Sequence, residues 1–155
     1  MHARLRFAAL VFSLSFLVVS GSLAQTPQPS PLAQTAFSEK TASDLIQKLS
    51  QTLEAHNQKR FLALFDIPQM RQGGVFRQQI NLFFTHTELI RVHMNLVESS
   101  VEDQGPSLSI DAELDAQPIN GPAWRRNDRL TLRLAGSGES WKIIDMQPRS
   151  FFAIP

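Results

Sequence analysis

The C-terminal half of the chain alternates apolar and polar residues with a period of two. The alternation runs through the ranges Glu88–Asp103, Leu108–Gln117 and Arg129–Leu134, and a last apolar run lies in Ser140–Met146. This period places one face of each strand on a core and leaves the other face in water, as in antiparallel sheets. We therefore predict four long antiparallel strands between Glu88 and Phe152.

Two irregularities in this pattern predict local geometry. Val97 and Val101 are out of phase with the apolar residues before them, so we expect a bulge near Leu96–Val97. A two-residue turn at Asn120–Gly121 would pair inward Ala112 with outward Arg129 and bury the wrong face. The loop between the second and third strands must therefore hold an odd number of residues or a bulge.

With that loop, the outward residues of the second and third strands form a charged ladder. Asp111, Glu113 and Asp115 then lie opposite or diagonal to Arg125, Arg129 and Arg133. The two signs match in number, which favours a solvated face with cross-strand ion pairs over a charged binding strip.

Three segments before the strands follow the helical period instead. The first begins near Thr41, whose spacing to Asp44 is that of a capping box, and ends near Asn57; the second covers Lys59–Asp66. The third follows Gly73–Gly74 and has an apolar side consisting of Phe76, Ile80, Phe83 and Phe84. We interpret these aromatic residues as core and not as a ligand cage. The fold class is α+β, with three N-terminal helices on one face of a curved antiparallel sheet of about four long strands.

The N-terminus has the pattern of an export signal. Residues 1–24 combine a short basic head, the apolar run Phe7–Ser20 and the small residues Ser22 and Ala24, which predicts cleavage before Gln25. The alternative is an uncleaved N-terminal membrane anchor, but the run is shorter than the roughly 20 residues that a bilayer core requires. Residues 25–37 are predicted to be a disordered Pro-rich spacer and residues 38–152 a single domain, exported to the periplasm or secreted.

The amino-acid composition excludes several kinds of covalent link, reactive group and binding partner. The chain has no cysteine, so it contains no disulfide, no thiol nucleophile and no cysteine metal site. Its 15 Lys and Arg exceed its 14 Asp and Glu by one, and without Arg4 and Arg6 the net charge becomes −1. A near-neutral surface does not attract nucleic acid or an anionic membrane, so we expect neither partner after signal cleavage.

At this point the chain resembles a known superfamily. A leucine-striped helix, a Phe-rich helix ending in Leu64-Phe65-Asp66, a third helix and a meander ending in Ser-Trp-Lys-Ile-Ile-Asp-Met are similar to the nuclear transport factor 2-like superfamily, also called the cystatin-like α+β cone. The resemblance covers roughly Ser38–Phe152. It implies a pocket between helices and sheet, or a homodimer through the sheet. The family's short strand pair between the second and third helices is reduced or lost, because only Ile67–Val75 is available.

The resemblance also implies an acid–base enzyme as an alternative, since the family includes ketosteroid isomerase, scytalone dehydratase and polyketide cyclases. The chain has no tyrosine, so the tyrosine-based sites of the first two are missing. We interpret His56 as a residue of the core margin, His86 as a helix-end residue and His93 as a surface or interface residue. No element has the spacing of a metal site, and we expect no metal or cofactor.

A few polar residues interrupt the inward face of the sheet. Arg126 and Asp128 share the parity of Leu130, and Asp145 shares that of Ile143. With Trp124, Arg126 and Asp128 are the candidate ligand-binding residues; Asp128 and Asp145 are weak candidates for a general base. The alternative is a strand end that frays toward solvent, or an Arg126–Asp128 ion pair at the rim of the cone.

These sequence features leave two functions. The first is an exported non-enzymatic module that binds an apolar or anionic small molecule or assembles with protein, with a homodimer through the sheet or the Phe151–Phe152 tail. The alternative is a small-molecule isomerase, dehydratase or cyclase with an acid–base site in the cone. A closed interior would favour the first, and an open cavity at Arg126, Asp128 and Asp145 the second.

Overall fold

The computed structural model describes residues 37–102, 105–138 and 140–155. The predicted signal peptide and nearly all of the predicted spacer, residues 1–36, lie outside the described residues. Among the described helices, none has the length and apolar character needed to cross a bilayer.

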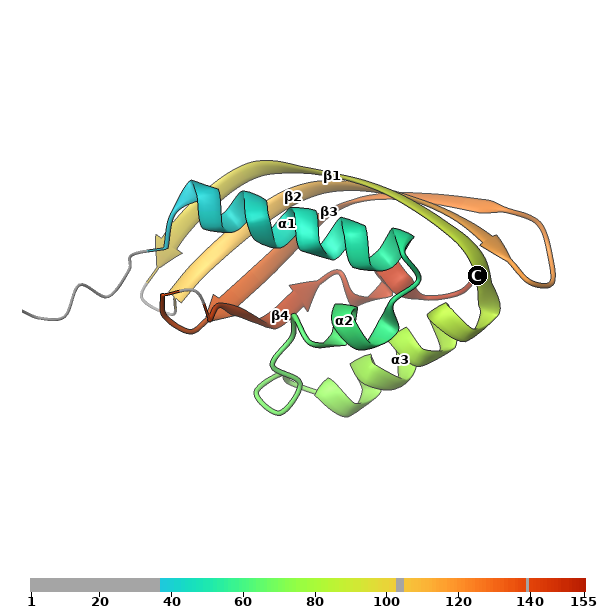
Figure 1. Cartoon of the computed structure of the whole chain (residues 1–155), viewed down its shortest axis with the longest axis horizontal. Coiled ribbons are helices and arrows are strands. Elements are labelled where there is room, and N and C mark those ends of the chain that lie inside the picture. Colours follow the sequence, from blue (N-terminus) through green and yellow to red (C-terminus); the bar gives the residue numbers. More distant parts are fainter. Residues whose placement is uncertain (1–36, 103–104, 139) are drawn as a thin grey trace, which may run out of the picture. The chain divides into compact units, whose positions relative to one another are not determined.

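Helices come first in the described chain and strands follow. Their order is α1 (Glu39–Glu54), α2 (Gln58–Leu62), α3 (Gly73–His86), β1 (Thr87–Glu102), β2 (Gly105–Pro118), β3 (Trp124–Ala135), β4 (Lys142–Gln147) and the 3-10 helix η1 (Arg149–Phe152). The four strands form one antiparallel sheet in the order β1-β2-β3-β4. Figure 1 shows the sheet arching over the helices, which cover its concave face. The predicted fold class is confirmed.

Helix ends differ from the predicted ones because the capping residues lie elsewhere. Ser38 is the N-cap of α1 and its hydroxyl accepts a hydrogen bond from the Thr41 backbone N–H at 3.2 Å, so the helix begins before Thr41. Asn57 caps α2 through a 3.0 Å bond from the Arg60 N–H, which separates α2 from α1. Between the two helices His56 has a left-handed φ of 52°.

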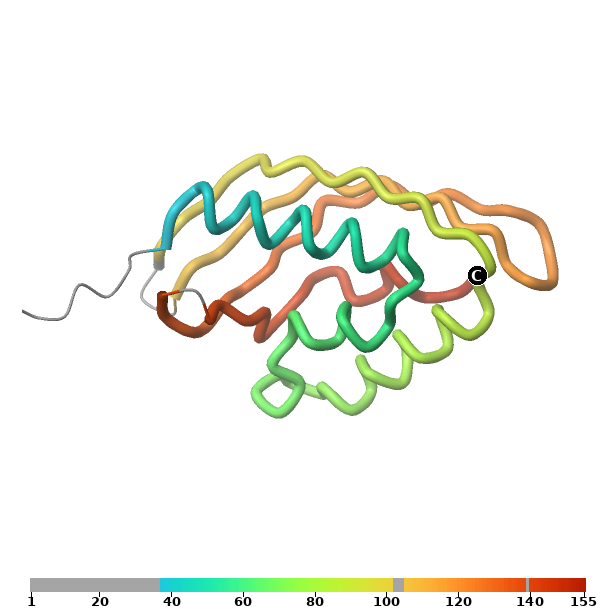
Figure 2. The backbone as a smooth tube through the Cα atoms, viewed as in Figure 1, coloured from blue at the N-terminus to red at the C-terminus, as the bar shows by residue number. Residues whose placement is uncertain are grey.

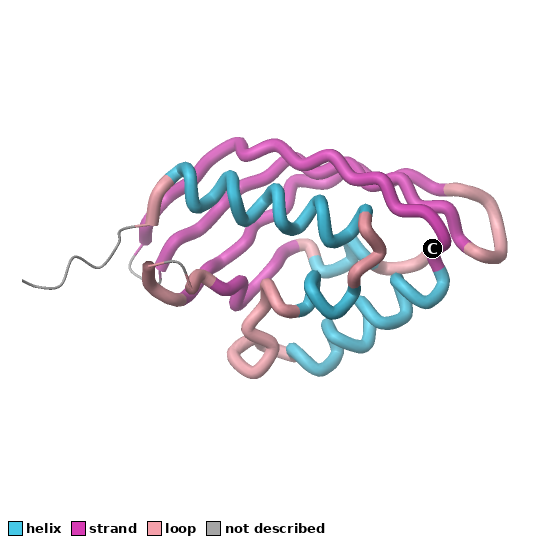
Figure 3. The backbone as a smooth tube through the Cα atoms, in the orientation of Figure 1, coloured by secondary structure: helices cyan, strands magenta, loops and turns pink. Residues whose placement is uncertain are grey.

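Helix α2 stops well before Asp66 because the chain turns to pair with the sheet edge. The Asp66 N–H donates to the Ile143 carbonyl and the Ile143 N–H donates to the Leu64 carbonyl, at 2.9 and 3.0 Å. This parallel bridge at Phe65 is the single strand-like pairing in the described residues between α2 and α3. The predicted reduction of the family's strand pair is therefore confirmed; Figure 3 shows the segment as loop.

Register in the first three strands follows the predictions. The shift between Leu96 and Glu98 places the bulge at Val97, as expected. Ala116 pairs with Trp124, so the loop of residues 117–123 has an odd number of members. Figure 2 shows this loop extending beyond the end of the sheet.

Strand β4 departs from simple alternation. Leu134 pairs with Ile143 but Arg133 pairs with Asp145, so a bulge lies between the two pairs. Because of the bulge, Ile143 and Met146 are both buried, and Asp145 lies on the same face as Arg133. The prediction that Asp145 shares the inward face with Ile143 is wrong.

Candidate binding site at the mouth of the cone

The interior of the cone is filled by phenylalanine. Phe61 packs against Phe65, Phe84 and Phe152 with ring centroids 5.1 to 5.8 Å apart. The cavity that remains between them and the sheet measures about 10 Å³. This is about the space of a single water molecule and far below the roughly 300 Å³ of a small ligand pocket. No organic ligand fits inside without repacking the core.

In the part of the chain that the structure describes, no acid–base side chain is fully buried in the core. Among the described residues, Thr87 is the one buried polar residue. His56 lies outside the core and stacks on Phe84 at 5.2 Å, and the exposed His93 contacts the Asn95 amide at 3.0 Å. No three His, Asp or Glu side chains of the described chain lie together as metal ligands.

Arg126 lies on the concave face, as its parity predicts, and it holds the C-terminal segment. One guanidinium nitrogen, Nη1, donates to the backbone carbonyls of Phe151 and Ala153, both at 2.8 Å, and to that of Ser150. The guanidinium also lies over the Trp124 ring, 5.0 Å from its centroid. Arg126 therefore fixes η1 against β3.

Because η1 is held in this way, the end of the chain closes the core. Phe151 and Phe152 are 0% and 1% exposed. Both rings therefore pack inside the monomer, and a homodimer through this tail stays a prediction. Figure 1 shows η1 and the segment after it passing beneath the sheet toward the end of α3.

The two aspartates that the sequence singled out lie in different environments. Asp128 is half-buried on the face of Arg126, but no ion pair joins the two residues in the described chain. Asp145 accepts a 2.8 Å hydrogen bond from Arg149, and both side chains are about three-quarters buried, at 26% and 21% exposed. The structure does not bring Asp145 to Asp128, and their catalytic roles stay predictions.

Arg149 also controls the protonation of Asp145. Partial burial alone would raise the pKa of this carboxyl, but the hydrogen bonds from Arg149 and Gln147 outweigh it and lower the pKa below its ordinary value. Asp145 is thus held as a carboxylate that ties β4 to the start of η1.

The outer face of the sheet carries the predicted ladder. Arg129 bonds Asp111 at 2.8 Å, and Arg125 contacts Asp115 at 2.5 Å and Glu113 at 3.1 Å. The hydrogen bond from Arg129 lowers the pKa of Asp111 despite slight desolvation. All of these side chains are at least 39% exposed, so the ladder is a solvated surface.

A pocket of about 450 Å³ lies where α3, the loop of residues 117–123 and the C-terminal segment meet. We name it the mouth pocket. Its lining consists of Thr85, His86, Pro118, Ile119, Asn120, Gly121, Pro122, Trp124, Ile154 and Pro155. Most of these side chains are apolar, and none of them carries a fixed charge.

Backbone contacts shape the mouth pocket. The Ile119 N–H donates to the His86 carbonyl at 2.9 Å, which attaches the loop to the end of α3. Arg126 brings Ile154 to the same place by holding the adjacent Ala153 carbonyl. Ile119 and Ile154 are 59% and 40% exposed, so two large apolar side chains face water here.

Trp124 connects the mouth pocket to the core. Its ring is half-buried and meets Phe83 edge-on at 6.3 Å, and its buried Nε1 has no hydrogen-bond partner among the described atoms. Sequence reasoning identified Trp124 and Arg126 but missed Ile119 and Ile154. An isoleucine between Pro118 and Pro122 in a polar loop was the available signal.

No protein-family model matches the chain, and no curated protein matches its sequence. Several solved structures share its fold. A conserved protein from Planctomyces limnophilus DSM 3776 superimposes with a TM-score of 0.59 at 10% identity, covering 70% of this chain and 91% of that one. A nuclear transport factor 2-like superfamily protein from Salmonella enterica serovar Typhimurium superimposes with a TM-score of 0.59 at 11% identity, covering 69% of this chain and 86% of that one.

A third structure, the intermembrane space region of the chloroplast protein ARC6, gives a TM-score of 0.53 at 11% identity and covers 72% of this chain and 95% of that one. At such identities the likeness concerns the fold, and the fold hosts unrelated functions. The arrangement of three helices on the concave face of a four-stranded antiparallel sheet is the one expected for this fold. The chain has the nuclear transport factor 2-like fold.

Proposed function

We propose that the protein is an exported, non-enzymatic binding module that takes an apolar small molecule in the mouth pocket. The observation that carries the proposal is the contrast between two cavities: about 10 Å³ inside the cone and about 450 Å³ at its mouth. A ligand of drug-like size fits the second and not the first. Export rests on the signal pattern of residues 1–24.

The lining favours an apolar ligand. Ile119, Trp124 and Ile154 offer apolar surface that is partly wet in the free protein, so covering it with a ligand is favourable. The guanidinium over the Trp124 ring adds one positive charge nearby, which allows an anionic group on the ligand but does not require one.

Catalysis in the cone has less support. Arg126, a candidate ligand-binding residue, uses Nη1 on three backbone carbonyls, and Asp145 faces away from the interior. The isomerase, dehydratase or cyclase alternative needs an acid–base group beside a cavity in the cone, and the lining of the internal cavity has none.

Tryptophan fluorescence tests the proposal. In a Trp141→Phe variant Trp124 is the one remaining tryptophan, because the chain has two. We expect neutral phenylnaphthylamine and anionic anilinonaphthalene sulfonate to quench Trp124 saturably, with energy transfer to the bound dye. Binding of both would indicate an apolar site, and binding of the sulfonate alone would indicate an anion requirement.

Ile119→Ser supplies the site variant and Val101→Ser its control. Both residues are exposed, at 59% and 70%, so neither change should unfold the protein, but only Ile119 lines the mouth pocket. We expect Ile119→Ser to weaken dye binding about tenfold and Val101→Ser to leave it unchanged. Equal affinities in the two variants, or no saturable binding in the parent, would refute the proposal.

A further inference from the structure

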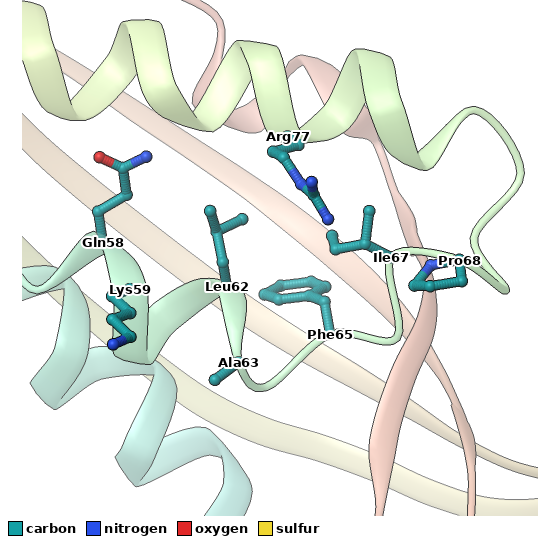
Figure 4. A pocket seen from close by; sticks show the side chains of 8 residues that line it. All are labelled: Gln58, Lys59, Leu62, Ala63, Phe65, Ile67, Pro68 and Arg77. Carbon is teal, nitrogen blue, oxygen red and sulfur yellow. The ribbon is translucent and has the colours of Figure 1, made fainter.

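An apolar groove, separate from the mouth pocket, lies between α2, the loop after it and the first half of α3. Figure 4 shows Leu62, Phe65 and Ile67 between the two helices, with Arg77 of α3 reaching over Ile67. The groove measures about 610 Å³, and its other lining residues are Gln58, Lys59, Ala63 and Pro68. Leu62 and Ile67 are only half-buried, so the apolar floor is open to solvent.

Hydrogen bonds hold the walls of the groove in place. The Gln58 amide donates to the Asn81 side-chain carbonyl and links α2 to α3, and the Lys142 ammonium donates to the Ala63 carbonyl. Gly73 packs directly against the Ile67 backbone, since a Cβ at this position would lie 2.0 Å from the Ile67 oxygen. The groove is thus built into the joined helices.

Charge distinguishes this surface from the rest of the domain. Residues 57–86 hold four Lys and Arg against one Asp, a net charge of +3, while the rest of residues 37–155 holds nine against thirteen, a net charge of −4. Lys59 and Arg77 are exposed and neither forms an ion pair among the described residues. On the sheet, the exposed Arg125 and Arg129 are both paired, whereas the exposed Arg91 of β1 forms no ion pair among the described residues.

We propose that this groove binds an acidic peptide segment of a partner protein, with an apolar side chain on the floor and carboxylates at Lys59 and Arg77. An apolar floor between two unpaired cations complements that combination, because the floor supplies contact area and the cations supply orientation. The ladder of a second copy of this chain is a poorer occupant, since Asp111 and Asp115 already bond Arg129 and Arg125.

This inference is independent of the mouth pocket. The two sites share α3 but no lining residue, because His86 ends the helix at one site and Arg77 lies near its start at the other. A variant that no longer binds dye at the mouth pocket should still bind peptide in the groove. A variant that no longer binds peptide should still bind dye.

A displayed library of random nonapeptides, selected on protein purified from expression of the full chain, tests the groove. We expect the selected peptides to be rich in Asp and Glu beside Leu, Ile or Phe, and to bind about tenfold more weakly in 0.5 M salt. We expect Lys59→Glu with Arg77→Glu to abolish their binding. Arg60→Glu with Arg71→Glu is the matched control, because it reverses the same number of charges and both residues are cations of the same segment outside the groove.

Leu62→Ser tests the apolar floor separately, and we expect it to weaken the selected peptides about tenfold. A circular dichroism melt within 2 °C of the parent confirms that each variant is folded; Leu62→Ala replaces Leu62→Ser if the latter unfolds. No enrichment of acidic peptides would overturn the proposal. Equal loss of binding in the variant with Arg60→Glu and Arg71→Glu would also overturn it, because it would indicate long-range attraction alone.

Discussion

Arg126 shows how one side chain can determine the position of a whole segment. Its parity with Leu130 predicts a residue on the concave face, and that orientation is correct. The same position suggests an anion anchor, because an arginine on an apolar face needs a partner. Its partners are the carbonyls of Ser150, Phe151 and Ala153, which the sequence could not indicate because the contact depends on the path of the chain after β4.

Removal of Arg126 should therefore loosen the C-terminal segment. Arg126→Ala loses charge-assisted bonds to three carbonyls and should lower the free energy of unfolding by about 2 kcal/mol. Arg126→Lys should recover part of the loss. Urea unfolding followed by tryptophan fluorescence measures both.

Arg125→Ala is the control for this prediction, because Arg125 is the neighbouring arginine on the outer face and its ion pairs are exposed. Its effect on the urea midpoint should be much smaller than that of Arg126→Ala. If the two alanine variants shifted the midpoint equally, the bonds to η1 would have no special importance.

Asp145 makes stability depend on pH. Its folded-state pKa is lower than its unfolded value, so the carboxylate stabilises the fold above the ordinary pKa of 3.8. That stabilisation is lost as the pH falls through the lowered folded-state value. Asp145→Asn should cost about 1 kcal/mol at pH 7 and progressively less below pH 3.8.

Urea unfolding of both proteins at pH 7 and pH 3 measures this difference. In an Arg149→Gln background the Asp145→Asn substitution should cost less at pH 7, because the Arg149 partner is gone and only the weaker contact with Gln147 remains. A cost that stays constant with pH would show that the ion pair does not act in this way.

At the scale of elements, the start of α3 offers a matched pair of glycines. Gly73→Ala places a methyl group 2.0 Å from the Ile67 carbonyl oxygen, so it should destabilise the protein by about 2 kcal/mol. At Gly74 an added Cβ would meet no atom within 4 Å beyond its chain neighbours and the backbone of its own helix, and alanine should stabilise the helix by about 0.5 kcal/mol. Opposite shifts of the urea midpoint are expected, and shifts of the same sign would contradict the close approach.

Sequence pattern predicted the strands β1 to β3 well, because a period of two determines which face each residue takes. It failed at β4, where Ile143, Ile144 and Met146 are all apolar, so alternation leaves the position of the bulge undetermined. Helix ends were shifted because Ser38, as well as Thr41, can cap a helix.

The mouth pocket was not predicted from the sequence, although one of its lining residues, Trp124, was a candidate ligand-binding residue. Two other lining residues, Ile119 and Ile154, come together through a loop and a terminal segment. Their proximity depends on the Ile119–His86 bond and on Arg126, and neither contact leaves a periodic signal.

At the scale of the whole molecule, the fold provides a cone and phenylalanine side chains close it. Phe61 is completely buried and contacts three other rings, so its removal should leave a cavity beside Phe65, Phe84 and Phe152. Phe61→Ala should cost about 3 to 4 kcal/mol, and the cavity should remain dry because its lining is apolar. Phe61→Leu opens a smaller cavity, and it replaces Phe61→Ala in the experiment if the alanine variant does not fold.

Benzene should then stabilise the variant and not the parent. Both proteins carry Ile119→Ser, which weakens the mouth pocket equally in the two, and thermal unfolding is followed with and without saturating benzene. A ligand that binds the folded state alone raises the melting temperature, so we expect an increase of several degrees in Phe61→Ala. An equal increase in the parent would mean that its cone is already open, and an internal acid–base site would regain support. An increase in the variant alone would show that one aromatic side chain separates this closed scaffold from one with an internal pocket.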